Sequence, residues 1–379
     1  MDFVCEKKEL QGGVNQVERI VSTRSTLPII GNILFEAFKN NIKLSANNLE
    51  MGITINIPAA VSREGSVLMP AKTLGGIVAK LPDSKIDFKL GENGMVKIAY
   101  DQSHFNLHSL PPDEFPLLPK VKDGKIFNAD SDKLLALIKQ TIFAASSSEE
   151  KYVLNGVLVE LGKSGSAGDN TNIRMVATDG YRLAKKGEKI EGLGAGEMSV
   201  IVPAKALTEL SRILEGKKDQ KIKITVNNEQ IGFEVGEVYL VSRVIQGQFP
   251  DYKQVIPKKS TIRVTIDTKE FLEAAERAAV VASGSANITR FDVKGGKVTL
   301  SANTPDVGSI DEVLRADVKG GERTQISFNI RLITDALKVI ETKSVVLELN
   351  EGLSPGVIRP DGEGEQIYII MPIRTQEAG

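Results

Sequence analysis

Two stretches of the chain, residues 200–210 (VIVPAKALTEL) and residues 67–77 (VLMPAKTLGGI), are nearly the same. In each, a strand-like apolar run leads into a proline and then into apolar residues at helical spacing. Proline suits the first turn of a helix, because its missing N–H would have no partner there. Pro70 and Pro203 lie 203 − 70 = 133 residues apart. This spacing predicts an internal repeat, which decides the fold.

A second pair of landmarks has almost the same spacing. Pro116 in DEFPLLP and Pro250 in GQFPDYKQVIP are 250 − 116 = 134 residues apart, and each follows a phenylalanine. The segment IKLSANNLEMGITI at 42–55 also resembles IRMVATDGYRLAKK at 173–186. Both segments alternate apolar and polar residues around a short polar turn, which predicts a β-hairpin.

A third, weaker copy follows the first two. KVTLSANTPD at 297–306 repeats the hairpin, and ISFNIRLITDALKVIE at 326–341 stands where the other copies have the proline-led helix. We therefore expect three similar domains, at 1–124, 125–253 and 254–379. Each would contain two helices and about eight strands in antiparallel sheets, an α+β fold. The expected helix windows are 8–22, 70–81, 132–146, 203–217, 268–283 and 329–341, and we expect Ser131 and Thr268 to be N-caps.

Composition limits the class of protein. A chain of 379 residues suits two or three domains, and its apolar share of 41% suffices for cores. The formal net charge is only −1, so any basic surface must be local. The single cysteine, Cys5, excludes an internal disulfide framework and a cysteine metal site. We find no signal peptide and no long apolar run, and we expect a soluble cytoplasmic protein.

Residues with catalytic chemistry are scarce. His104 and His108 are the only histidines, and HFNLHSL alternates like a strand, so we expect both on a solvent-exposed face. The GKS at 162–164 lacks the glycine that a phosphate-binding loop needs five residues before Gly162, because Val157 stands there. We therefore predict no enzyme activity, no catalytic residue, no metal and no cofactor.

Several motifs resemble one family. ATDGYRLA at 177–184, VPAKAL at 202–207, FPDYKQVIP at 249–257 and YIIMPIR at 368–374 are similar to motifs of the bacterial DNA sliding clamp, the beta subunit of DNA polymerase III. RSTLPIIGN at 24–32 resembles the first-domain signature of the same family. The resemblance covers the whole chain, and the motifs occur in family order.

The resemblance implies a processivity factor for DNA replication. Two chains of three domains would assemble head to tail as a ring, a homodimer with helices inside and sheets outside. Duplex DNA would pass through the ring and meet basic residues of the inner helices without being read for sequence. The expected helix windows together carry a small net positive charge, whereas the whole chain is at −1. The candidate DNA-binding residues are Arg24, Lys72, Lys80, Lys139, Lys205, Arg212 and Lys338.

The resemblance also implies a cleft between the second and third domains, where partners bind through a short apolar peptide. The implied partners are the replicative polymerase catalytic subunit, the clamp loader, and other polymerases and repair proteins. The implied cleft residues are Leu154, Thr178, Gly180, Tyr181, Arg182, Leu183, Pro250, Val255, Asn329, Ile370, Met371, Pro372 and Arg374. For Leu183 and Val255, plain core packing is the competing interpretation. The implied dimer contact lies near Phe105 and Leu107 on one side and Val280 and Val281 on the other.

Two other classes of function remain open from the residues alone. One is a hydrolase on a repeated α+β scaffold, which clustered buried carboxylates or a bound metal would favour. The other is a repeat scaffold protein that binds protein partners only.

Overall fold

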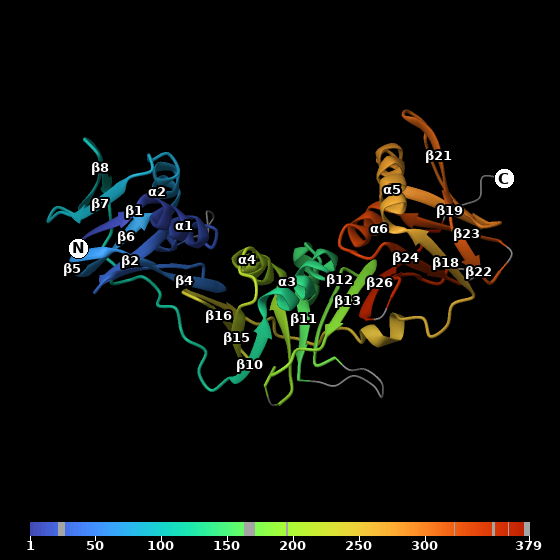
Figure 1. The fold of residues 1–379 in the computed structure, drawn as a ribbon, viewed down its shortest axis with the longest axis horizontal. Coiled ribbons are helices and arrows are strands. Elements are labelled where there is room, and N and C mark those ends of the chain that lie inside the picture. Colours follow the sequence, from blue (N-terminus) through green and yellow to red (C-terminus); the bar gives the residue numbers. More distant parts are fainter. Residues whose placement is uncertain are drawn as a thin grey trace. The chain divides into compact units, whose positions relative to one another are not determined.

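The computed structural model describes residues 1–21, 27–162, 171–194, 196–321, 323–350, 353–362 and 364–374. The chain forms two compact units, Met1–Asp132 with Thr208–Val244, and Lys133–Leu207 with Ile245–Gly379. Each unit therefore combines one terminal repeat with half of the middle repeat (Figure 1).

The first repeat runs from the N-terminus to the connector that contains Pro116. Its elements are β1 (Asp2–Glu6), α1 (Lys7–Glu18), η1 (Pro28–Gly31), β2 (Asn32–Phe38), β3 (Asn41–Asn47), β4 (Met51–Pro58), β5 (Ala60–Arg63), β6 (Gly65–Pro70), α2 (Ala71–Val78), β7 (Lys85–Leu90), β8 (Met95–Tyr100) and β9 (Ser103–His108).

The second repeat has a similar order of elements, with four described strands instead of five between its two α-helices and with more 3-10 helices than the first. They are β10 (Lys125–Asp130), α3 (Ser131–Lys139), η2 (Ile142–Ala144), η3 (Glu149–Asn155), β11 (Gly156–Leu161), β12 (Ile173–Thr178), β13 (Arg182–Glu188), β14 (Met198–Pro203), α4 (Ala204–Leu214), β15 (Lys221–Val226), β16 (Gln230–Val235), β17 (Val238–Arg243) and η4 (Tyr252–Val255).

The third repeat contains the last described elements of the chain. Its elements are β18 (Ile262–Asp267), α5 (Thr268–Ala282), β19 (Ile288–Lys294), β20 (Lys297–Thr304), β21 (Gly308–Arg315), β22 (Asp317–Lys319), β23 (Arg323–Asn329), α6 (Ile330–Leu337), β24 (Ser344–Leu349), β25 (Gly356–Pro360) and β26 (Glu365–Ile370). Within the residues that the structure describes, each repeat thus carries two α-helices, as the sequence predicts.

Two sheets continue from one repeat into the next. One has the strand order β10-β15-β16-β17-β4-β3-β2-β6, so β17 of the second repeat pairs with β4 of the first. The other contains β18-β24-β25-β26-β13-β12-β11-β14, so β26 of the third repeat pairs with β13 of the second. The two junctions have the same order of equivalent strands, and both pairings are antiparallel. The remaining sheets have the orders β5-β1-β7-β8-β9 and β21-β20-β19-β23.

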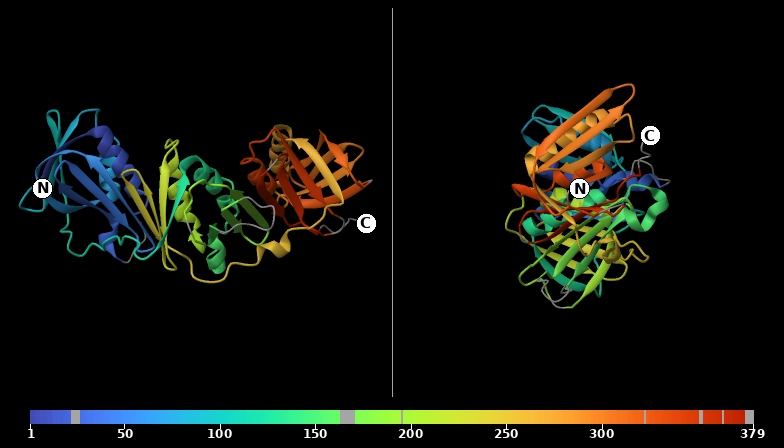
Figure 2. Two further views of the ribbon diagram at one scale, coloured as in Figure 1. Left: turned by 60° about the horizontal axis from the view of Figure 1, so that its bottom comes forward. Right: turned by 90° about the vertical axis from the view of Figure 1, so that its right-hand side faces the viewer.

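Helix pairs cover these sheets with their apolar sides. Helix α1 packs on α2, β3 and β4, while α5 packs on α6, β20 and β21 (Figures 1 and 2). The approach of α1 to the sheet is close at Gly13, where an added Cβ would lie 2.7 Å from Leu44 Cδ1. A glycine at this position therefore lets the helix lie directly on β3.

Helix starts differ in detail from the sequence-based expectation. Pro70 and Pro203 are the last residues of β6 and β14, one position before α2 and α4 rather than within their first turns. Asp267, not Thr268, caps α5, and its carboxylate accepts hydrogen bonds from the N–H groups of Lys269 and Glu270. Ser131 is the first helical residue of α3. A carboxylate accepts two N–H groups more effectively than a hydroxyl, which favours Asp267.

His104 and His108 lie exposed on β9, as the alternation predicts. Lys163 and Ser164 of the GKS stretch lie outside the described residues. Within the described ranges, no helix is both long and apolar enough to cross a membrane.

Candidate peptide cleft and nucleic-acid interface

The predicted cleft residues gather where β13 meets β26. Arg182 pairs with Ile370 and Leu183 with Ile369 in the antiparallel register. Beyond the end of β26, the Met371 N–H donates to the Tyr181 carbonyl at 2.9 Å. The backbone of the second repeat thereby holds the last residues of the third repeat, which places both sets of predicted residues together.

The turn between β12 and β13 is fixed by its own side chains. Asp179 Oδ1 accepts the N–H groups of Tyr181 (2.8 Å) and Arg182 (3.0 Å). The Thr178 hydroxyl donates to the Arg182 carbonyl at 2.6 Å and accepts the Gly180 N–H at 3.1 Å. Gly180 has φ +93°, a conformation open to glycine at little cost. Thr178 and Gly180 thus shape the turn that presents Tyr181.

Arg182 is anchored on several sides. Its Nε lies 3.0 Å from Asp179 Oδ2, and its Nη1 lies 2.5 Å from Asp335 Oδ2 on α6. The guanidinium also stacks over the Phe143 ring, 5.3 Å from the centroid. These contacts link the turn to a helix of the third repeat and leave Arg182 little freedom.

Exposure divides the predicted apolar lining into two groups. Val255 and Met371 are 45% and 39% exposed, so each has surface that a ligand can still cover. Leu183 and Ile370 are 4% and 1% exposed. Leu183 packs in a core cluster with Val176 and other buried residues, whereas almost half of the Val255 side chain is exposed.

The other predicted residues lie on other segments of the second and third repeats. Leu154 is half-buried on η3, and Pro250 is exposed just before η4. Asn329 caps α6, with its side-chain oxygen accepting the Arg331 N–H at 3.0 Å. Pro372 is half-buried and Arg374 is exposed.

A buried polar network beneath the junction was not predicted. Arg174 is 6% exposed, and its guanidinium contacts Glu365 (2.9 Å) and Glu160 (3.2 Å). Lys185 pairs with Glu365 as well, and the Tyr252 hydroxyl donates to Glu160 at 3.1 Å. An arginine within the apolar strand IRMVAT was the available signal, but nothing in the sequence indicates that its partner lies in another repeat.

In this network the environment keeps the Arg174 guanidinium charged and the Tyr252 hydroxyl neutral. Burial alone would lower the pKa of Arg174, but the hydrogen bonds and charge of Glu365 outweigh it, so the pKa lies above its usual value. Burial, followed by the charge of Glu160, raises the pKa of Tyr252. Tyr252 therefore remains a neutral donor to Glu160.

The candidate DNA-binding residues lie on or beside the helices. Lys72, Lys205 and Arg212 are exposed on α2 or α4, Lys139 ends α3, and Lys80 and Lys338 follow α2 and α6. Arg212 is paired with Glu209, and Lys338 lies 3.1 Å from Glu276, which leaves both partly neutralised. Arg24 lies outside the described residues.

Three family models match the chain in succession. The N-terminal, central and C-terminal domains of the DNA polymerase III beta subunit match residues 1–119, 128–251 and 253–374. The chain belongs to the DNA polymerase III beta subunit family. The beta sliding clamp of Synechocystis sp. is 33% identical, over 99% of this chain and 99% of that protein.

Solved structures of the family have the same fold as this beta-subunit chain. The sliding clamp of Bacillus subtilis superposes with a TM-score of 0.92 at 30% identity, covering 99% of this chain and 100% of that one. The clamp of Bartonella birtlesii, solved bound to griselimycin, is 29% identical with a TM-score of 0.92, covering 99% of this chain and 100% of that one. The three-domain clamp fold is therefore confirmed.

Two outer strands of the beta-subunit chain carry the residues of the predicted dimer contact or pack beside them. β9, with Phe105 36% exposed and Leu107 half-buried, is the outer strand of its sheet. β21 is the outer strand of the four-stranded sheet and packs on α5, which carries Val280 (71% exposed) and Val281. Outer strands present unpaired N–H and C=O groups, so each is open to a further strand.

Proposed function

We propose that this chain works as a ring-shaped processivity factor that encircles duplex DNA and tethers the replicative polymerase. Two copies would close the ring head to tail, with β9 of one copy beside β21 of the other. The observation that carries the proposal is the match to beta sliding clamps over almost the whole chain.

Topology rather than affinity would hold such a ring on DNA. A closed ring cannot leave a duplex sideways, so its contacts with DNA need only be weak. Exposed lysines such as Lys72 and Lys205 would meet phosphates, which attract cations without regard to base sequence. A weak, sequence-independent attraction lets the ring slide. No catalytic step is required, and the chain would act without enzyme activity or a cofactor.

The junction of β13 and β26 would receive partners. An apolar side chain laid between Val255 and Met371 would cover surface that is exposed in the free chain. Methionine adapts its shape easily, which suits a site for several partners. We propose that short apolar peptides of the polymerase catalytic subunit, the clamp loader, and other polymerases and repair proteins bind here in turn. The setting would be the cytoplasm, where bacterial DNA is replicated.

The proposal is tested by retention on DNA. The protein is loaded by a clamp loader onto nicked circular DNA and separated from free protein by gel filtration. A ring should stay on the circle and run off after the circle is cut once with a restriction enzyme. Equal loss from circular and linear DNA would favour a scaffold that binds protein partners only.

A further inference from the structure

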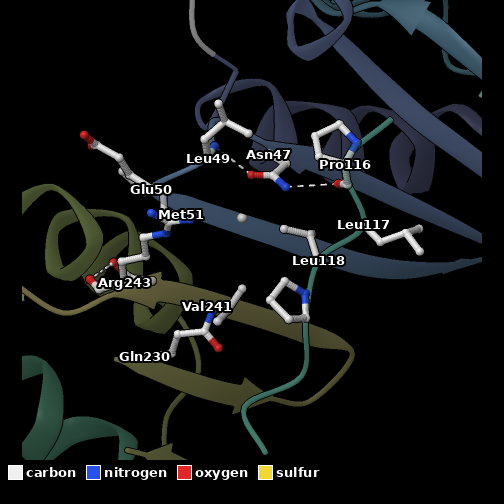
Figure 3. A pocket seen from close by; sticks show the side chains of 13 residues that line it. Asn47, Leu49, Glu50, Met51, Pro116, Leu117, Leu118, Gln230, Val241 and Arg243 are labelled. Carbon is white, nitrogen blue, oxygen red and sulfur yellow. Dashed lines mark hydrogen bonds between the residues drawn. The ribbon is translucent and has the colours of Figure 1, made fainter. Parts of the chain in front are cut away.

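A pocket lies at the junction of β4 and β17, within the unit Met1–Asp132 with Thr208–Val244. Its volume is about 240 Å³. The lining includes Leu49, Gly52, Leu117, Leu118, Val241 and Arg243 (Figure 3). Typical small-molecule sites have about 300–1,000 Å³, so this pocket suits an anchoring side chain better than a whole metabolite.

The pocket occupies the position in the first junction that the proposed peptide cleft occupies in the second. Met51 pairs with Ser242 in β4 and β17, as Arg182 pairs with Ile370 in β13 and β26. Past the strand end, the Arg243 N–H donates to the Glu50 carbonyl at 2.8 Å, which matches the bond from Met371 to Tyr181. The two junctions thus present equivalent backbone frames with different side chains.

The turn beside the pocket is strained at a leucine. Asn48 Oδ1 accepts the N–H groups of Glu50 (3.1 Å) and Met51 (2.8 Å), as Asp179 does in the second repeat. Leu49 has φ +74°, where the equivalent residue is Gly180. A bulky residue in this region is a genuine outlier, and such strain clusters at binding sites. Here the strained residue places a leucine, 45% exposed, on the rim of the pocket.

The opposite wall is preformed by the connector between the first two repeats. Asn47 Nδ2 donates to the Pro116 carbonyl at 3.0 Å. Further along, the Val121 N–H donates to the Tyr239 hydroxyl at 3.1 Å. Leu118 lies so close to β4 that an added Cβ on Gly52 would come within 1.7 Å of its Cδ2. The adjacent Leu117 is 81% exposed and extends the apolar rim.

Charge beside the pocket favours an anion. Arg243 lines it and makes no ion pair with any residue that the structure describes. Lys120 is exposed and directly follows the lining residue Pro119. Glu50 is the acidic residue in the lining, and Figure 3 shows its carboxylate directed away from Leu118. A ligand seated between the leucines would therefore meet a guanidinium.

We propose that this pocket binds an extended segment of a partner protein, which inserts an aliphatic side chain between Leu49 and Leu117 and places an adjacent acidic residue on Arg243. The segment would differ from a ligand of the β13–β26 cleft, which has Met371 where this pocket has Arg243. The inference rests on the proposed function, because it takes this surface of the clamp as a place for partners.

A charge-swap titration tests the proposal. The probes are two fluorescein-labelled decapeptides with central Glu-Leu-Leu or Lys-Leu-Leu in a glycine-serine background. Binding to the full-length protein is followed by fluorescence anisotropy for wild type, Arg243→Glu and Leu49→Gly. An exposed ion pair is worth about 1.4-fold to fivefold in affinity, and covering the 45% exposed surface of Leu49 is worth about threefold to tenfold. Arg243→Glu should weaken the acidic peptide by about the ion-pair factor and strengthen the basic one.

Leu49→Gly should weaken both peptides while leaving the protein folded, because glycine removes the strain at this turn. The Leu-Leu of the probes also suits the proposed β13–β26 cleft, so the titrations are repeated in the double variant Met371→Ala/Pro372→Ala, where the charge-dependent effect of Arg243→Glu should persist. If that double variant loses the acidic peptide and Arg243→Glu does not, the peptide binds the β13–β26 cleft. The pocket proposal is then overturned, while the proposed function stands. No binding to the wild type, or the same affinities in Arg243→Glu, would also overturn it.

Discussion

Truncating Met371 and Val255 together tests the proposed peptide cleft. Full burial of either side chain stabilises a complex by about 1.5–3 kcal/mol. In the free chain they are 39% and 45% exposed, so a ligand gains only those fractions, together about 1.3–2.5 kcal/mol. The variant Met371→Ala/Val255→Ala should therefore bind an apolar peptide about 9-fold to 70-fold more weakly.

The assay is fluorescence anisotropy of a labelled peptide with leucine and phenylalanine anchors. Ile126→Ala serves as the matched control, since Ile126 is an aliphatic residue, 51% exposed, outside the predicted cleft. Sedimentation checks that the assembly state of each variant is unchanged. Equal peptide affinities for the double variant and the control would refute the placement of the cleft at β13 and β26.

Four other predictions concern assembly, DNA, stability and reactivity. Val281→Asp places a charge in the predicted dimer contact and should shift the protein toward monomers, measured by sedimentation equilibrium; an unchanged dimer would contradict the interface. Reversing Lys72 and Lys205 to glutamate should lower retention on DNA and flatten its dependence on salt concentration, equally for unrelated sequences. Arg174→Met should lower the free energy of unfolding, measured in urea, by about 2–4 kcal/mol. Breaking a buried ion pair usually costs about 3–5 kcal/mol, and the cost should be smaller here because Glu160 and Glu365 keep other partners. Burial, with the charges of nearby glutamates, raises the pKa of Cys5 to about 12. Because the thiolate is the reactive form, iodoacetamide should modify Cys5 only in unfolded protein. Rapid labelling of the native chain would contradict this prediction.

Local sequence patterns predicted the repeated elements well. A strand with alternating apolar residues or a helix with an apolar side is encoded over a few neighbouring residues. The paired helices of each repeat and the exposed histidines of β9 followed from such patterns. The helix starts were less accurate, because the choice between Asp267 and Thr268 as the cap depends on hydrogen bonds within a single turn. The domain boundaries and the roles of the basic residues stay predictions.

Local patterns could not predict which candidate site residues are exposed, because exposure depends on contacts between residues far apart in the chain. The sequence places Leu183 and Val255 in one predicted cleft, but only the packed sheet makes the first a core residue and leaves the second exposed. Which residue is buried depends on the elements that cover it, and those elements come from other repeats.

By itself, the sequence determined that this protein has three similar α+β repeats and which family it resembles, since repeats and motifs are read along the chain. Tertiary structure decided that the repeats share sheets through β4 with β17 and β13 with β26. It also decided that Arg174 is paired with Glu365, 191 residues away. Hydrogen bonds between strands and ion pairs across a junction depend on which segments meet in space, and no short stretch of sequence encodes that meeting.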